Sequence, residues 1–253
     1  MNNFLQQYDL TGKVALVTGS SRGIGRSIAL GLGACGASVA IHYVGHKEHA
    51  IEVASQIPES CTICKDLGDD DAPSFIINEV QEKIGAVDIL VLNASVQYRQ
   101  AWDEVSREKF DQQFVVNFRS AFELIQRAAP HMLKQQWGRI LTLGSVQQHR
   151  PHSQMIPYAA TKSALENMVR ALAKQYAAHG VTVNNISPGV ILTDRNQAVM
   201  LDQTYREKVL DLIPANRMGQ SEECVPAALL LCSDAGSYIT GIDLPVDGGL
   251  RLP

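Results

Sequence analysis

A tyrosine and a lysine four residues apart, Tyr158 and Lys162, are the side chains in this sequence best suited to proton chemistry. On a helix, positions i and i+4 share one face, so the phenol and the ammonium would point the same way. A nearby cation favours phenolate and lowers the pKa of a tyrosine. Tyr158 is therefore a candidate general acid or base near neutral pH. Ser145, thirteen residues upstream, offers a hydroxyl to the same substrate oxygen, an oxyanion-type role.

The Tyr158–Lys162 pair alone could be a chance pair on an amphipathic helix, but a second motif stands near the start of the chain. Residues 18–25 read TGSSRGIG, after an apolar run at 13–17 that predicts a buried strand and before helical spacing at 24–32. Strand, glycine turn and helix are typical of a dinucleotide site. Glycine lets the backbone approach a pyrophosphate, and the helix N-terminus adds N–H groups and partial positive charge.

The elements that must position these residues alternate along the chain. Apolar runs predict strands at residues 13–18, 37–43, 60–64, 87–92, 138–144, 181–187 and 241–246. Helical patterns lie near residues 23–34, 47–56, 69–84, 103–135, 157–179 and 221–232. The alternation predicts an α/β fold, a Rossmann-type doubly wound parallel sheet with helices on both faces, in a single domain over residues 1–253.

Ligands of such sheets bind beyond the carboxyl ends of the strands. The residues that directly follow a predicted strand are Gly19, Asp66, Asn93, Ser145 and Pro188. Residues 191–219 break the alternation and carry helical stretches between Pro188 and Pro214. We interpret this segment as a lid that excludes water and selects substrate.

Composition narrows the class of protein. The 253 residues carry 22 Lys+Arg against 26 Asp+Glu, for a net charge of -4, with no basic stripe that would hold nucleic acid. The apolar stretches fall short of the ~20 residues that span a bilayer, and the N-terminus shows no signal peptide. Five scattered cysteines fit reduced thiols. We therefore expect a cytoplasmic enzyme with a small-molecule substrate, and neither a nucleic-acid nor a membrane partner.

Two short pairs raise the question of a metal. Cys61 and Cys64 fall in a predicted strand, where residues three apart point to opposite faces, and no second pair completes a zinc set. His149 and His152 have no carboxylate close in sequence, so we interpret them as a loop pair lining the active site. No metal site is predicted.

Taken together, the motifs resemble the short-chain dehydrogenase/reductase family over nearly the whole chain, closest in pattern to 3-oxoacyl-[acyl-carrier-protein] reductases. The matching pieces are residues 18–25, Asp66-Leu67, Asn93-Ala94, Asn117, Ser145, Tyr158-x-x-x-Lys162 and Pro188-Gly189. The resemblance implies that Asn117, Ser145, Tyr158 and Lys162 are the catalytic set. In the family the lysine also binds the nicotinamide ribose, and the asparagine holds a water that links the lysine to solvent. Asn117 could equally cap a kink in a long helix. Ser95 departs from the usual glycine.

The cofactor is predicted to be NADP(H) rather than NAD(H). An NAD site places an acid about 20 residues beyond the glycine motif, but residues 41–47 read IHYVGHK and the first acid is Glu48. Arg22 offers a planar fork of donors to a 2′-phosphate. The cofactor-binding residues that we expect are Gly19, Ser21, Arg22, Gly23, Ile24, Gly25, Tyr43, Asp66, Leu67, Asn93, Ala94, Tyr158, Lys162, Pro188, Gly189, Val190 and Thr193.

The substrate is less constrained. Gln97, Gln147 and His149 predict a pocket rich in hydrogen-bonding groups, suited to a sugar, polyol or keto acid, although they could instead face solvent at the rim. The predicted reaction is hydride transfer between NADPH and a carbonyl or secondary alcohol. A 3-oxoacyl-[acyl-carrier-protein] reductase and a non-catalytic NADP redox sensor remain as alternatives. Long apolar helices at 103–135 and 157–179, together with the resemblance, favour a homotetramer.

Overall fold

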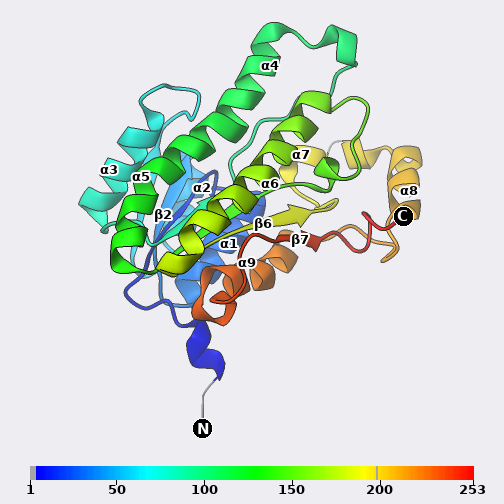
Figure 1. Cartoon of the computed structure of the whole chain (residues 1–253). Helices are drawn as coiled ribbons and strands as arrows, with labels where there is room; N and C mark the ends of the chain where they lie inside the picture. Colours follow the sequence, from blue (N-terminus) through cyan, green and yellow to red (C-terminus); the bar gives the residue numbers. More distant parts are fainter. Residues whose placement is uncertain (1–3, 198) are drawn as a thin grey trace.

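One parallel sheet organises the molecule. The structure is a computed structural model, and it describes residues 4–197 and 199–253. Its strand order is β3-β2-β1-β4-β5-β6-β7 (Figure 1). The strands are β1 (Val14–Val17), β2 (Ser38–Tyr43), β3 (Ser60–Cys64), β4 (Ile89–Leu92), β5 (Gly138–Leu143), β6 (Val181–Pro188) and β7 (Asp243–Val246). Each predicted strand is confirmed to within two residues at either end, and so is the doubly wound fold class.

Helices cover both faces of this sheet (Figure 1). They are α1 (Gly23–Ala34), α2 (Lys47–Ala54), α3 (Ala72–Lys83), α4 (Arg107–Phe114), α5 (Ser120–Gln135), α6 (Ile156–Tyr176), α7 (Asp194–Gln197), α8 (Gln203–Asp211) and α9 (Val225–Cys232). Helices α1, α2 and α9 contribute to one hydrophobic cluster, and α3, α5 and α6 to the other.

Strand β1 shows how the sequence produces two cores. Val14 and Leu16 join the cluster shared with α3, α5 and α6, whereas Ala15 and Val17 join the cluster shared with α1, α2 and α9. Side chains alternate across a strand, so a strand covered on both faces must be apolar throughout. Because β1 is buried on both faces, it holds the start of the glycine turn in a fixed position at the end of the strand.

The predicted helix at 103–135 is wrong as a single element. It comprises a short turn at Trp102–Glu104, then α4, a π-helical turn at Val115–Arg119, and α5. The extra residue of a π turn repositions side chains and is often found at functional sites. Here the turn contains Asn117, whose amide is buried and bonded to the backbone of Val96. The helix is interrupted by a π turn because this turn brings the Asn117 amide to the backbone of Val96.

The segment predicted as a lid carries α7, a short turn at Val199–Leu201, and α8. Its two ends meet in a parallel bridge between Ile191 and Gly219. Asp202 caps α8 by accepting from the Tyr205 N–H at 3.1 Å. The segment packs through Ile213 against a third, small cluster with Val146 and Leu250. It is therefore attached to the domain by fewer apolar contacts than the helices that cover the sheet.

In the part of the chain that the structure describes, no helix has both the length and the apolar character needed to span a membrane.

Candidate active site

A cleft of about 840 Å³ opens along the carboxyl ends of the strands. Its wall contains most of the residues predicted for the site: Gly19, Ser21, Arg22, Gly23, Ile24, Tyr43, Asp66, Leu67, Asn93, Ala94, Gln97, Ser145, Gln147, Tyr158, Lys162, Pro188, Gly189, Val190 and Thr193. Three predicted residues, Gly25, Asn117 and His149, do not line it. The volume lies within the range of pockets that hold a small molecule or cofactor.

Tyr158 and Lys162 lie in the first turns of α6, which starts at the cleft floor. Both side chains are buried, with 6 % and 2 % of their surface exposed. The Lys162 ammonium donates to the Leu143 carbonyl oxygen at 2.6 Å and lies 5.5 Å from the centroid of the Tyr158 ring. A buried cation beside a phenol stabilises the phenolate, so the pair can exchange a proton with a bound ligand.

Ser145 leaves strand β5 and caps a short turn at Val146–Gln148. Its hydroxyl accepts from the Gln147 N–H at 3.2 Å, and its own N–H donates to Gln148 Oε1 at 3.2 Å. Gln148 in turn donates to Glu166 on α6 at 2.9 Å. Because a Cβ at Gly144 would overlap Gln148 Oε1, only glycine there allows this approach. The serine is thus tied to the helix that carries Tyr158 and Lys162.

Asn117 braces the site without lining the cleft. Its Oδ1 accepts from the Val96 N–H at 2.8 Å, and its Nδ2 donates to the Val96 carbonyl at 2.9 Å and to Thr161 Oγ1 at 3.2 Å. Thr161 Oγ1 donates to the Tyr158 carbonyl oxygen at 2.7 Å. The asparagine therefore joins the segment after β4 to the first turn of α6. This contact corresponds to the interpretation of Asn117 as a structural residue at a helix kink.

The glycine turn after β1 fits a phosphate cradle. Gly19 and Gly23 have φ of +63° and +57°, a region that residues with a Cβ rarely adopt. Gly25 packs behind the cleft wall. A Cβ there would overlap Asn93 Nδ2 and the Gly19 carbonyl oxygen, so the position requires glycine. Asn93 Nδ2 donates to the carbonyls of Thr18 and Gly19 at 2.9 Å each. The turn is held open above the N-terminus of α1, where free N–H groups favour anions.

His42, which the sequence reasoning missed, holds this turn from the other side. It is 1 % exposed at the end of β2; its Nδ1 accepts from the Gly19 N–H at 3.1 Å, and its Nε2 lies 2.8 Å from the Lys65 carbonyl oxygen. The two partners require a neutral ring with its proton on Nε2. Burial lowers the pKa of His42 to about 4, against the opposing effect of the bond to Lys65. The signal in the sequence, a polar residue inside a strand, did not reveal its partner.

The region beside Arg22 differs from a site that binds a ribose 2′-hydroxyl through a carboxylate. Here the cleft is lined by Arg22, Tyr43, Val44, Gly45 and His46, and the acid beside Arg22 is Asp194 rather than a residue at the end of β2. The ion pair from Arg22 to Asp194 is long, at 4.0 Å, and both side chains are more than half exposed. Exposed pairs of this kind contribute little, so the guanidinium is available to a phosphate.

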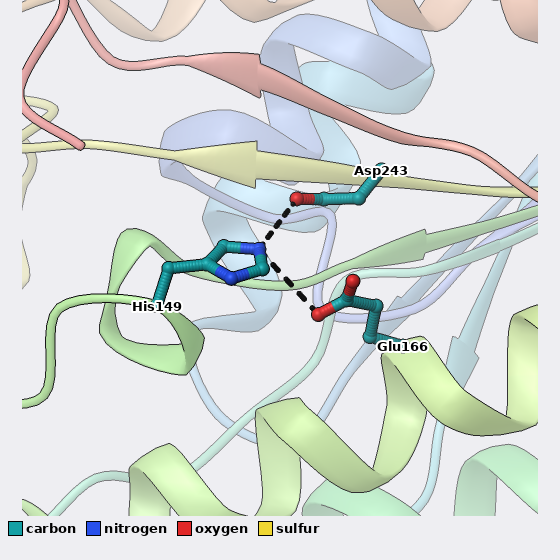
Figure 2. Close-up of side chains that lie close together, drawn as sticks. All are labelled: His149, Glu166 and Asp243. Atoms are coloured by element: carbon teal, nitrogen blue, oxygen red, sulfur yellow. Dashed lines mark hydrogen bonds and ion pairs between the residues drawn. The ribbon is translucent and has the colours of Figure 1, made fainter. Parts of the chain in front are cut away.

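His149 was predicted to contact substrate, and the structure places it elsewhere. Its imidazole does not line the cleft, and its Nε2 lies 3.0 Å from Asp243 on β7 and 3.5 Å from Glu166 on α6 (Figure 2). The sequence did not reveal these two contacts, because both carboxylates are distant from His149 in sequence. The three groups have the spacing of metal ligands. However, Glu166 already pairs with Arg170, and Asp243 with Arg251 at 3.1 Å. We interpret the cluster as an ion-pair network that fixes the loop after Ser145.

The mouth of the cleft contains further polar residues, among them His152, which was predicted with His149 to line the active site. Arg99 follows β4, Arg150 and His152 lie in the loop after Ser145, and Tyr205 comes from α8. Arg99 Nη1 donates to Tyr205 Oη at 3.2 Å, across 106 positions of sequence. Gln97 and Gln147 line the same part of the cleft. The mouth is therefore rich in hydrogen-bond donors and carries permanent positive charge.

The chain matches known proteins along nearly its whole length. A family described as "Enoyl-(Acyl carrier protein) reductase" matches residues 19–251. The chain is 36% identical over 244 residues to 3-oxoacyl-[acyl-carrier-protein] reductase of Staphylococcus aureus, covering 95% of this chain and 98% of that one. It is 34% identical over 250 residues to gluconate 5-dehydrogenase of Gluconobacter oxydans, covering 97% of each. A solved gluconate 5-dehydrogenase of Burkholderia cenocepacia, in complex with NADP and tartrate, matches with TM-score 0.92, 32% identity, and coverage of 98% and 99%.

Proposed function

The chain belongs to the short-chain dehydrogenase/reductase family, and from this premise we propose that it is an NADP(H)-dependent oxidoreductase acting on a carbonyl or secondary alcohol. When bound, the nicotinamide supplies or accepts the hydride. Tyr158 gives a proton to the substrate oxygen during reduction and takes one during oxidation. Ser145 donates a hydrogen bond to the same oxygen, and Lys162 keeps Tyr158 able to release its proton.

The residues present fit NADP(H). The strained glycines and the α1 N-terminus form a cradle for phosphate. Arg22 offers a cation to a 2′-phosphate, and Asp194, 4.0 Å from the guanidinium, is more than half exposed. The Burkholderia cenocepacia relative was solved with NADP. Gly19, Gly23 and Arg22 would hold the phosphates, and Tyr158 and Lys162 would face the nicotinamide end of the cleft.

The proposed substrate is a polar small molecule, such as a sugar, polyol or keto acid. The observation that carries this proposal is the polar mouth of the cleft, where Gln97, Arg99, Gln147, Arg150 and His152 lie within one lining. The names of two relatives, both gluconate 5-dehydrogenases, support it. A 3-oxoacyl-[acyl-carrier-protein] reductase remains the second candidate, because the Staphylococcus aureus relative is 36% identical. A redox sensor has no use for the buried Tyr158–Lys162 pair.

One experiment separates these candidates. Oxidation of NADPH would be followed against matched panels of ketoses, keto acids, simple ketones and 3-oxoacyl thioesters, and the reverse reaction against alditols and aldonates. We expect the polar panels to give the largest kcat/KM. Preference for the thioesters would select the acyl-carrier reductase, and NADP(H) binding without any turnover would select the sensor.

We also propose a homotetramer, working in the cytoplasm. Phe110 on α4 and Phe122 on α5 are 43% and 41% exposed, and β7 is a half-buried edge strand paired only with β6 among the described strands. Exposed apolar helix faces and open sheet edges are typical of self-complementary interfaces. The five cysteines are free thiols, as a reducing compartment would keep them. Light scattering at micromolar concentration tests the assembly, and a mass near 27.6 kDa would exclude it.

A further inference from the structure

The arginines at the cleft mouth have no acidic partner among the residues that the structure describes. Arg99, Arg150 and His152 line the same cleft as Ser145 and Tyr158. Among the residues that the structure describes, the ion pairs made by arginines include neither Arg99 nor Arg150. Arg150 is instead anchored by a 2.6 Å hydrogen bond from its Nη1 to the Leu250 carbonyl oxygen. Two uncompensated guanidinium groups therefore face the space next to the reacting groups.

The guanidinium of Arg99 is held in a defined orientation. Its Nε donates to Gln154 Oε1 at 3.0 Å, and its Nη1 donates to Tyr205 Oη at 3.2 Å. The Tyr205 ring also lies under the guanidinium, 4.9 Å from its carbon. These contacts occupy Nε and one hydrogen of Nη1, and Nη2 lies beside His152. A guanidinium fixed in this way can donate from Nη2 to an anionic oxygen at little entropic cost.

His152 supplies the second donor. Its Nδ1 accepts from the Gln154 N–H at 3.1 Å, so a neutral ring carries its proton on Nε2. Burial, and then the charge of Arg99, lower the pKa of His152, which keeps the ring neutral at pH 7. Nε2 lies 3.2 Å from Nη2 of Arg99. Two N–H donors thus face one another without an acceptor, and an anionic oxygen beside both would accept from both.

We propose that Arg99 and His152 bind a carboxylate of the substrate, so that the enzyme interconverts a hydroxy acid and its keto acid rather than a neutral sugar or polyol. This inference rests on the proposed function and narrows its substrate class. Arg150 adds long-range attraction for the same anion. Because Tyr205 belongs to α8, the lid segment helps to build the carboxylate site.

Matched substrates test the proposal. Aldonates with four to six carbons, and the keto acids derived from them, would be compared with the alditols and ketoses of the same configuration, which differ only in the carboxylate. Sugar phosphates form a third panel, since phosphate shares the same oxyanion chemistry. We expect the acids to give the highest kcat/KM. Preference for the phosphates, or equal values for acids and alditols, would overturn the carboxylate assignment while leaving the oxidoreductase proposal intact.

Variants test whether Arg99 causes the preference for acids. Arg99→Gln should lower kcat/KM for acids by about 10- to 100-fold, mainly through KM, the scale of a lost charged hydrogen bond. The same variant should lower kcat/KM for alditols by a clearly smaller factor than for acids. Arg107→Gln, an exposed arginine of α4 outside the cleft, is the matched control. An equal loss with acids and alditols would show that Arg99 only supports the fold, and the proposal would be abandoned.

Binding without turnover separates this proposal from the reaction itself. In NADP-loaded Tyr158→Phe protein, calorimetry would measure the affinity for gluconate and for glucitol, with and without His152→Asn. We expect gluconate to bind at least about 10-fold tighter than glucitol and to lose most of that advantage in the double variant. Equal affinities would refute the carboxylate site, whatever the turnover panels show.

Discussion

The floor and the mouth of the cleft are built in different ways. At the floor, Lys162 and Asn117 are buried and bond to main-chain atoms, the carbonyl of Leu143 and the amide of Val96. At the mouth, Arg99 is exposed and is held by the side chains of Gln154 and Tyr205. Backbone partners cannot change by mutation, whereas side-chain partners can. The comparison indicates that the reaction type is fixed by the sheet, and that substrate choice is set by adjustable loops.

The largest expected effect tests the floor. Tyr158→Phe removes the hydroxyl that exchanges the proton, so turnover should fall by about 10²- to 10⁴-fold. NADPH should still bind, because the ring and its packing remain. Steady-state kinetics with the best substrate and fluorescence titration of NADPH measure the two quantities. Tyr176→Phe, near the far end of α6, is the control. Near-normal turnover in Tyr158→Phe would show that the floor does not carry the chemistry.

The second prediction concerns the buried His42. Its pKa falls from 6.5 to about 4 in the folded protein, so the unfolded chain binds more protons between these values. The free energy of unfolding should therefore decrease as pH is lowered through this range, by about 2 kcal/mol between pH 7 and pH 5. Protonation of the folded protein removes the acceptor of the Gly19 N–H, so NADPH affinity should fall only as the pH approaches about 4.

His42→Asn keeps a neutral acceptor near Gly19 but cannot titrate, so urea unfolding should show a flatter pH dependence. His179→Asn, an exposed histidine, provides the control. If the unfolding free energies of wild type and His42→Asn changed in parallel from pH 7 to pH 5, another group would cause the pH dependence. The buried histidine at the floor would then not set the stability of the protein in this range.

A smaller effect is expected at Arg22, which lies on the cleft but is more than half exposed. NADPH should bind about 10-fold tighter than NADH to the wild type. Arg22→Ala should remove most of this preference and leave NADH affinity unchanged. Arg26→Ala, which pairs with Glu52 on the neighbouring helix, is the matched control. Equal dissociation constants for the two cofactors in wild type would contradict the assignment of the 2′-phosphate site.

The last prediction concerns the mobility of the segment at the mouth of the cleft. Residues 191–219 rest on a small cluster around Ile213, and segments with few apolar contacts open locally at low cost. Their amide protons should exchange rapidly without ligand and slow down by about 10-fold or more when NADP and substrate bind. Strand β4 should be protected in both states. Equal, strong protection of the segment in both states would make it a fixed wall rather than a lid.

Much of the floor could be predicted from the sequence, because its signals are local. The glycine turn, the strand before it and the Tyr158–Lys162 spacing each lie within a few residues, and the sheet brings them together by topology alone. The strand ends agree to within two residues for the same reason. His42 shows the limit: its partner Gly19 is 23 positions away, and nothing local distinguishes a buried acceptor from an ordinary polar residue.

The mouth was harder to predict, because its contacts depend on how loops pack. The site residue Gln97 was chosen by its position after β4, but Arg99, two residues further, was not, since its partner Tyr205 lies in the lid. His149 was assigned to the cleft by its place in the loop after Ser145. In the structure its imidazole lies beside Asp243, which is distant in sequence. The helix at 103–135 was also wrongly predicted as one element. Its π turn contains Asn117, which bonds to the backbone of Val96, and this distant contact leaves no signal in the apolar pattern of the helix.

The bridge between Ile191 and Gly219 has an evolutionary consequence. It brings together the two ends of the lid, with Leu192 N–H bonded to the Gly219 carbonyl at 2.9 Å and Gly219 N–H to the Val190 carbonyl at 3.0 Å. Once the ends of a loop are joined, the entropic cost of lengthening it grows only slowly. The intervening segment can therefore be shortened, extended or exchanged with little effect on the sheet. As the lid that we predict, this segment allows substrate choice to change while the sheet and the reaction stay the same.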